Sequence, residues 1–190
     1  MAPDLPLDDP ATTWEERAQP ALDAVDGPVV AVGHSMGSSY APLVAVKRPG
    51  STLVHLCPRL AGFPEPDGAP AVFRPGFPFP PRGAGGSMVW NEEAAIEAMY
   101  SRLSPDLARD AARRLRPTTS AKGDYPLRSH PDVPTVLIYA RHDEFFEPDW
   151  ERFVARRLLG VEPIELPTGH FPMLEDPEGL AEVLDSVARR

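Results

Sequence analysis

The sequence predicts an α/β protein with a mostly parallel sheet, flanking helices and a helical insertion. Short apolar segments alternate with helical segments over residues 12–60, and the alternation resumes over residues 134–190. Such alternation is typical of a parallel sheet whose strands are connected by helices. Residues 61–133 interrupt it with a stretch rich in Pro and Gly and with two amphipathic helical segments. We therefore divide the chain into a core, residues 1–60 and 134–190, and a cap-like insertion, residues 61–133.

The composition is typical of an ordinary globular domain. The chain has 190 residues, of which 42% are hydrophobic and 25% charged, and this length suffices to bury a core. Its formal net charge of −9 disfavours nucleic acid and anionic membrane surfaces as partners, because like charges repel. A single cysteine excludes an internal disulfide framework. Neither a membrane-spanning run nor a signal peptide is recognisable, so we expect a cytoplasmic protein.

The first part of the core begins with a helix. Thr12 or Thr13 is the expected cap of this helix, and Pro20 should kink or divide it. An unbroken run of Val and Ala follows, which is typical of a buried strand in a parallel sheet. The expected elements are a helix over residues 12–25, a strand over 29–32, a helix over 36–47 and a strand over 52–57.

The insertion and the second part of the core follow the same logic. Residues 61–86 are too rich in Pro and Gly for a regular element. In the second helix of the insertion, Ser104 is the expected cap and Pro105 the first helical residue. The expected elements are helices over residues 91–101 and 104–115, a strand over 134–140, a helix over 148–159, a strand over 161–166 and a helix from 176 to the C-terminus.

Residues Gly33, His34, Ser35, Met36 and Gly37 form a Gly-x-Ser-x-Gly motif between an expected strand and an expected helix. Such a turn holds the serine oxygen above the sheet, and the glycines let neighbouring backbone pass without Cβ clashes. The first N–H groups of a helix are free, so the amide of Met36 can face a developing oxyanion. We predict Ser35 as a nucleophile, the alternative being a Gly-rich turn without a catalytic role.

A serine nucleophile needs a base, and the sequence offers five histidines. His170 follows the last expected strand, so it should lie at the carboxyl edge of the sheet, on the side of the motif. We predict it as the base, the alternative being a histidine of a surface loop. The other four are placed differently: His34 beside the nucleophile, His55 within a strand, His130 in a Pro-flanked loop and His142 before the best acid candidate.

Asp143 is the predicted acid, because it directly follows the strand expected to end at residue 140. Glu144 and Glu147 are close competitors, whereas Asp149 fits the start of the next helix. The remaining alternative is a solvated acidic turn. The order Ser35, Asp143, His170 is the order of nucleophile, acid and base in hydrolases of the α/β type.

These residues resemble a known family. The motif at residues 33–37, Asp143 and Gly169-His170 resemble the α/β-hydrolase fold superfamily, and residues 3–6, 53–58 and 169–172 resemble its small esterase and hydroxynitrile-lyase-like branch. The resemblance covers nearly the whole chain. It implies Ser35 as nucleophile, His170 as base, Asp143 as orienting acid, residues 61–133 as a cap over an acyl pocket, and no metal or organic cofactor. Haloalkane dehalogenases carry aspartate in place of Ser35, so dehalogenation is not expected.

Four residues are candidate substrate contacts. We predict His34, Trp90, Phe145 and Phe171 as substrate-binding residues, the alternative for Trp90 being core packing. Cys57, near a strand end, is interpreted as a core or pocket residue.

One departure from the superfamily concerns the region before the motif. Other members have several strands there, and a loop that supplies a second oxyanion N–H. Only 34 residues precede Ser35, and no such loop is recognisable. We therefore expect an N-terminally truncated form of the fold, whose strand at residues 29–32 is an exposed apolar edge prone to self-association. A fragment of a longer product, a partner that supplies the missing half, and a degenerate homologue are the three explanations.

The expected function is hydrolysis of small carboxylic esters through a Ser-His-Asp triad and an acyl-enzyme. Two alternatives remain open: a non-catalytic or degenerate relative that lacks half of the oxyanion hole, and a lyase that acts on cyanohydrins. The expected partner is a small ester, with no nucleic acid and no membrane.

Overall fold

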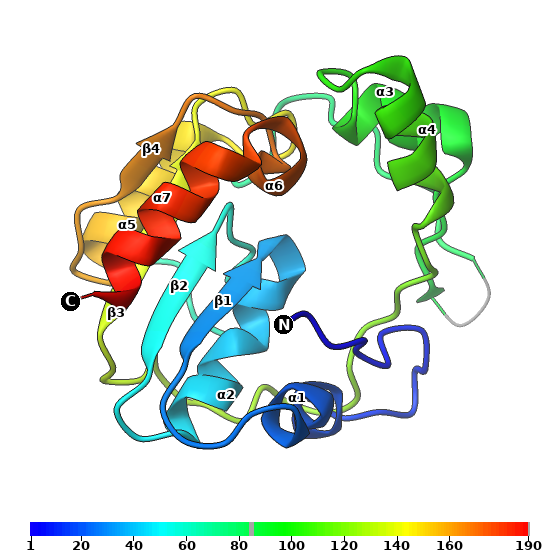
Figure 1. Ribbon diagram of the computed structural model, residues 1–190. Coiled ribbons are helices and arrows are strands. Elements are labelled where there is room, and N and C mark those ends of the chain that lie inside the picture. Colours follow the sequence, from blue (N-terminus) through cyan, green and yellow to red (C-terminus); the bar gives the residue numbers. More distant parts are fainter. Residues whose placement is uncertain (84–85, 190) are drawn as a thin grey trace.

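Four strands form one sheet in which sequence order equals spatial order. The computed structural model describes residues 1–83 and 86–189. Within these residues the strands are all parallel and lie in the order β1-β2-β3-β4 (Figure 1). Their bounds are β1 (Val30–His34), β2 (Thr52–Leu56), β3 (Thr135–Ala140) and β4 (Ile164–Leu166). The carboxyl ends of the strands therefore meet at one edge, where open α/β sheets place their sites.

Helices cover both faces of the sheet, which confirms the predicted fold class. The core helices are α1 (Trp14–Asp23), the 3-10 helix η1 (Ser35–Ser39), α2 (Ala41–Val46), α5 (Pro148–Arg157), α6 (Pro172–Glu175) and α7 (Pro177–Ala188). Side chains of α1 and α2 pack with Leu53, and those of α5 pack with Leu137, on one face of the sheet. On the other face, α7 packs with Val54 and Ile138 (Figure 1).

The start of α1 follows the expectation, but Pro20 does not divide the helix. The Thr13 hydroxyl accepts a hydrogen bond from the Glu16 amide at 3.2 Å, and the Glu16 carboxylate accepts one from the Thr13 amide at 2.7 Å. This reciprocal pair is a capping box, which satisfies two amides that the helix itself leaves unpaired. The helix continues through Pro20 to Asp23.

Two other expectations about helices need correction. The helix expected over residues 36–47 is divided into η1 and α2, and both meet at Tyr40. The short helix α6, which precedes α7, was not expected. No helix among the described residues is long and apolar enough to cross a membrane.

The insertion forms a helical pair with its own apolar cluster. Its helices are α3 (Glu92–Met99) and α4 (Pro105–Arg113), which lie apart from the sheet (Figure 1). Asn91 caps α3 by accepting from the Ala94 amide at 2.8 Å. Ser104 is the cap residue of α4 and Pro105 its first residue, as expected, although the Ser104 side chain makes no cap hydrogen bond. Phe145 and Phe171 of the core pack against this cluster. The cap therefore reaches the segments that carry the predicted acid and base. The domain division at residues 61–133 stays a prediction.

Strand β1 has one neighbour among the described residues. It pairs with β2 alone, and its Val32 is 41% exposed, so it is not covered on both faces as the apolar run suggested. A hollow of ≈ 270 Å³ lies beside it, lined by Val30 and Val32 together with Pro3, Leu5 and side chains of α1 and α2. The outer edge of β1 therefore offers unpaired backbone groups beside apolar side chains.

Candidate active site

Ser35 lies on a tight turn that requires an unusual backbone conformation at Ser35 and a glycine at position 33. It follows β1 directly, begins η1, and has a φ of 51°, a conformation that L residues rarely adopt. A Cβ at Gly33 would lie 2.6 Å from the Gly37 oxygen and 2.6 Å from Ser38 Cα, so glycine is required there. Gly37 has no such requirement, because a Cβ at that position would meet nothing within 4 Å. The steric reason expected for both glycines thus holds for Gly33 only.

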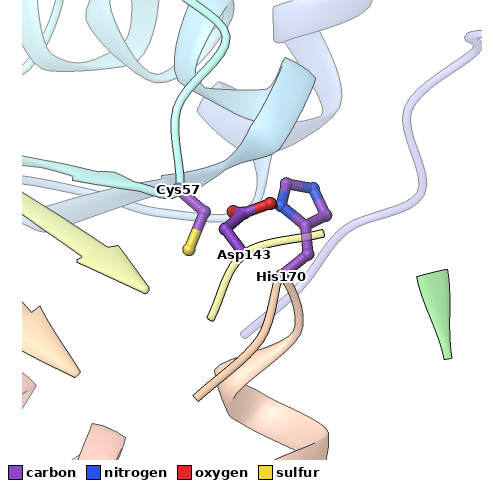
Figure 2. Close-up of side chains that lie close together, drawn as sticks. All are labelled: Cys57, Asp143 and His170. Carbon is purple, nitrogen blue, oxygen red and sulfur yellow. The ribbon is translucent and has the colours of Figure 1, made fainter. Parts of the chain in front are cut away.

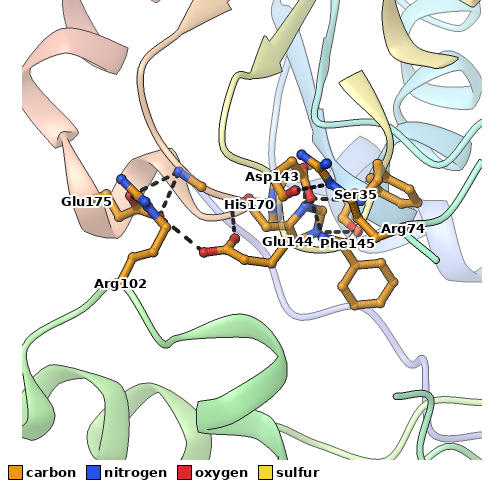
Figure 3. Close-up of polar contacts among 11 residues, drawn as sticks. Ser35, Arg74, Arg102, Asp143, Glu144, Phe145, His170 and Glu175 are labelled. Carbon is orange, nitrogen blue, oxygen red and sulfur yellow. Dashed lines mark hydrogen bonds and ion pairs between the residues drawn. The ribbon is translucent and has the colours of Figure 1, made fainter. Parts of the chain in front are cut away.

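The structure brings Ser35, His170 and Asp143 together at the carboxyl edge of the sheet. His170 Nε2 lies 3.0 Å from Ser35 Oγ, and His170 Nδ1 lies 2.7 Å from Asp143 Oδ2 (Figure 3). His170 is 2% exposed and Asp143 is 1% exposed. A carboxylate accepts the Nδ1 proton, so this network assigns the tautomer in which Nε2 is free to accept the serine proton.

The competing carboxylates have other partners. Glu144 accepts a hydrogen bond from the backbone amide of His170 at 3.1 Å, and Glu147 lies 3.7 Å from Arg74. Asp143 is thus the carboxylate that contacts the imidazole ring. Its second oxygen, Oδ1, accepts from the amides of Phe145 at 2.6 Å and of Phe146 at 2.8 Å, so both oxygens are held.

Cys57 lies behind Asp143, on the side away from the His170 imidazole. Its thiol, the Asp143 carboxylate and a His170 nitrogen lie within 4.8 Å of one another, with Asp143 between the other two (Figure 2). Burial, followed by the nearby charges of Glu151 and Asp143, raises the pKa of the Cys57 thiol well above its usual range. Cys57 is therefore a neutral, fully buried neighbour of the acid. His170 Nδ1 is already bound to Asp143, so we do not interpret these residues as a metal site, and the expected absence of a metal stays a prediction.

His34 lies beside Ser35 in the sequence, and its ring contacts the ring of His170. Its Nε2 lies 2.7 Å from the carbonyl oxygen of His170, and its ring centroid lies 4.9 Å from the His170 ring and 5.1 Å from the Phe171 ring. Burial, and secondarily the charge of His170, lowers the pKa of His34 to about 3. A neutral His34 therefore donates Nε2–H to the carbonyl and supports the position of His170. His55 pairs with His130 instead, at 3.1 Å between their Nε2 atoms.

A cavity of ≈ 420 Å³ lies beside His34, between the core and the cap. Among the predicted substrate contacts, His34 and Phe171 line it, whereas Phe145 and Trp90 do not. Phe145 stacks on His170 at 5.0 Å and contacts Phe77 at 3.9 Å, and Trp90 lies 6.1 Å from Phe77. The remaining lining is mostly apolar: Tyr100, Leu107, Ala111, Leu115, Met173 and Leu174, with the ion pair Asp110–Arg114.

Two arginines of the insertion contact the segments of the acid and the base, and the sequence did not indicate them. Arg74 Nε donates to the carbonyl oxygen of Asp143 at 2.9 Å. Arg102 lies 2.9 Å from Glu175, which accepts from the Gly169 amide at 2.9 Å (Figure 3). Both contacts join residues that are far apart in the sequence, and neither arginine belongs to a recognisable motif. Only the packing of the cap on the core reveals them.

The parallel sheet, the serine on its strand-to-helix turn and the acid–histidine pair at the same edge define an α/β protein of the hydrolase type. The chain belongs to the alpha/beta hydrolase family, whose model matches residues 1–183. No curated protein sequence is a significant match.

Solved structures support the fold at low sequence identity. A pyrethroid hydrolase from Sphingobium faniae JZ-2 is 21% identical, with a TM-score of 0.76 over 99% of this chain and 85% of that chain. Polyneuridine aldehyde esterase is 18% identical, with a TM-score of 0.68 over 93% of this chain and 80% of that chain. An N-acyl homoserine lactonase is 16% identical, with a TM-score of 0.66 over 98% of this chain and 76% of that chain.

Proposed function

We propose that this protein is a serine hydrolase that cleaves small carboxylic esters through an acyl-enzyme. The observation that carries the proposal is the continuous hydrogen-bonded arrangement of three side chains, with 3.0 Å between Ser35 Oγ and His170 Nε2 and 2.7 Å between His170 Nδ1 and Asp143 Oδ2. A serine hydroxyl is a weak nucleophile unless a base removes its proton as it attacks. His170 supplies that base, and Asp143 orients it.

The first half of the reaction forms the acyl-enzyme. Ser35 Oγ attacks the ester carbonyl carbon while His170 Nε2 takes the hydroxyl proton. The negative charge that develops on the carbonyl oxygen faces the amide of Met36, the second residue of η1, where backbone amides lack partners within the helix. The bond to the alcohol oxygen then breaks, His170 returns its proton to that oxygen, and the alcohol leaves with the acyl group bound to Ser35.

The second half repeats these steps with water. His170 takes a proton from water as its oxygen attacks the acyl carbon, and the proton then returns to Ser35 Oγ as the carboxylic acid leaves. The mostly apolar cavity beside His34 and Phe171 suits the hydrocarbon part of an ester. Two of the similar structures are named as an esterase and a lactonase, which agrees with ester chemistry. Contacts of Phe145 and Trp90 with substrate, a cytoplasmic location and independence from cofactors remain predictions.

Covalent labelling tests the role of Ser35. A fluorophosphonate reacts with an activated serine, because phosphorus takes the place of the acyl carbon. Intact-mass spectrometry should show one adduct on the wild type and none on Ser35→Ala. Ser186→Ala is the matched control, because Ser186 is an exposed serine whose hydroxyl donates to the Val183 carbonyl oxygen within α7. Equal labelling of wild type and Ser35→Ala would remove Ser35 as the nucleophile.

Turnover of model substrates distinguishes an ester hydrolase from a non-catalytic relative and from a cyanohydrin lyase. The wild type should hydrolyse p-nitrophenyl acetate with an initial burst of nitrophenol, because the alcohol leaves before the acyl-enzyme is hydrolysed. Labelling of Ser35 without hydrolysis of any small ester would support a non-catalytic relative. Cyanohydrin cleavage without ester hydrolysis would support the lyase.

A further inference from the structure

A guanidinium of the cap lies over the loop that carries His170. Arg102, between α3 and α4, places Nε 2.9 Å from Glu175 Oε2 and 3.9 Å from Glu144 Oε1 (Figure 3). We propose that Arg102 is a positioning residue, which holds this loop through Glu144 and Glu175 and so makes hydrolysis depend on the contact between cap and core. The kinetic part of this proposal rests on the proposed function.

Both carboxylates are bound to the backbone of the loop. The Gly169 amide donates to Glu175 Oε1 and Oε2, each at 2.9 Å, and the next amide, that of His170, donates to Glu144 Oε2 at 3.1 Å. Two successive amides of the loop are therefore held by two side chains that share one arginine. Because the imidazole of His170 is attached to this backbone, its distance from Ser35 depends on these bonds.

The same side chains leave no free space over Gly169. A Cβ at this position would lie 2.5 Å from Glu175 Oε1, 2.6 Å from Glu144 Oε2 and 2.8 Å from Arg102 Cδ. The two carboxylates and the arginine stem thus converge on one point of the backbone. Their convergence explains how a cap residue that does not contact the imidazole ring can still affect its position.

Arg102 also offsets the repulsion between the carboxylates of Glu144 and Glu175. Glu144 and Glu175 converge with Asp143 nearby, and burial, followed by the charges of Glu175 and Asp143, outweighs the amide hydrogen bonds and raises the pKa of Glu144. In the described part of the chain, the ion pairs of Glu144 and Glu175 are both with Arg102. Removing Arg102 leaves two repelling carboxylates against the loop, which weakens their hold on the two amides.

Two other arginines of the cap, at the end of α4, have different partners. Arg113 Nε lies 2.9 Å from Glu92, and Arg114 Nε lies 3.0 Å from Asp110, and these partners are residues of the cap. Arg113 therefore forms an ion pair of the same length as that of Arg102 with Glu175, but among the described residues its partner is Glu92 and not the loop of His170. Arg113→Ala is a matched control for the loss of a cap ion pair.

Steady-state kinetics of the full chain tests the proposal. Arg102→Ala should lower kcat for p-nitrophenyl acetate by about tenfold while KM changes by less than about twofold, because misplaced groups cost rate rather than ground-state binding. Arg102→Lys keeps a cation and should recover most of the lost activity. Arg113→Ala should keep the wild-type kcat. Equal losses in Arg102→Ala and Arg113→Ala, or no recovery in Arg102→Lys, would overturn the proposal.

Amide hydrogen exchange tests the same proposal without activity. In Arg102→Ala the amides of Gly169 and His170 should exchange faster than in the wild type, whereas amides of β3 should be unchanged. Unchanged exchange at both loop amides would overturn the positioning role even if kcat fell. Failure of the proposed function is distinguishable, because the wild type itself would then neither turn over esters nor react with fluorophosphonate.

Discussion

The two glycines around Ser35 are unequal, although the motif treats them alike. Gly33→Ala should lower ester hydrolysis strongly and destabilise the fold, because its Cβ would lie 2.6 Å from backbone atoms of Gly37 and Ser38. Gly37→Ala should retain near-wild-type activity, since a Cβ there meets nothing within 4 Å. Thermal unfolding and p-nitrophenyl acetate turnover of both variants measure the difference. Equal defects would mean that the steric argument is wrong.

A substitution at Asp143 can test the charge of its side chain without changing the shape. Asp143→Asn preserves the size of the side chain but removes the charge that orients the imidazole, so turnover should fall by about 10⁴-fold without unfolding, as in other enzymes with this arrangement. His170→Ala should abolish turnover. Glu147→Gln, which alters a carboxylate 3.7 Å from Arg74, is the control and should remain active. An active Asp143→Asn beside an inactive Glu147→Gln or Glu144→Gln would contradict the choice of acid.

The sequence predicted which residues meet at the sheet edge, because each of them follows a recognisable strand. The groups that hold them could not be predicted. Cys57 contacts Asp143 through a turn in which Cys57 has a φ of 43°, and the Arg102–Glu175 contact spans 73 residues. Such contacts depend on how the cap packs on the core, and no local pattern carries that information.

At the scale of single elements, α5 carries a buried acid with a consequence for stability. Glu151 is fully buried, and neither of its carboxylate oxygens has a hydrogen-bond partner among the described residues. Burial, and secondarily the charge of Asp143, raises its pKa well above the usual range. Burial thus favours the protonated, neutral form of Glu151 in the folded protein, while an exposed glutamate of the unfolded chain ionises above about pH 4.3.

This difference sets the sign of the pH dependence. Below about pH 4.3 Glu151 is protonated in both the folded and the unfolded chain, and its contribution to stability is complete. As the pH rises, the unfolded chain releases its proton first. The free energy of unfolding therefore falls, by up to about 1.4 kcal/mol per pH unit. Glu151→Gln keeps a neutral side chain of similar shape and should be more stable than wild type near neutral pH, with the difference vanishing near pH 4. Urea titrations across this range measure it. A variant less stable than wild type near neutral pH would show that the carboxylate is ionised and bound.

Element types were predicted better than element bounds. The four strands and most helices agree with the sequence patterns, but the strand expected over residues 161–166 is shortened to Ile164–Leu166. The helix after Ser35 is broken because the turn takes Ser35 to a φ of 51° and continues as the tighter η1. Backbone strain such as that at Ser35 is typical of functional sites, and helix propensity does not predict it.

At the scale of the whole molecule, the outer edge of β1 determines the expected state of association. Its unpaired N–H and C=O groups and the 41% exposed Val32 favour pairing with the same strand of a second copy. We expect light scattering to show dimers or larger species whose proportion rises with concentration. Val32→Lys should shift the protein toward the monomer, because an edge lysine opposes strand pairing.

Val46→Lys is the control for this experiment. Val46 is 39% exposed at the end of α2, so it receives the same charge at similar exposure away from the strand edge. It should leave the association unchanged. A wild type that stays monomeric at all concentrations, or equal effects of the two substitutions, would refute association through β1.

The hydrogen bond between Ser35 and His170 joins residues that are 135 positions apart, whereas His170 and Asp143 are only 27 apart. Closing the longer loop costs more chain entropy, so we expect this contact to form later in folding than the local contacts of the Ser35 turn. We expect the turn of Ser35 to form early from its neighbours, and His170 to reach Ser35 only after β4 has joined β3. If the proposed function is right, a partly folded chain carries an ordinary, unreactive serine. Recovery of activity during refolding would mark the last step of assembly, after most of the secondary structure has returned.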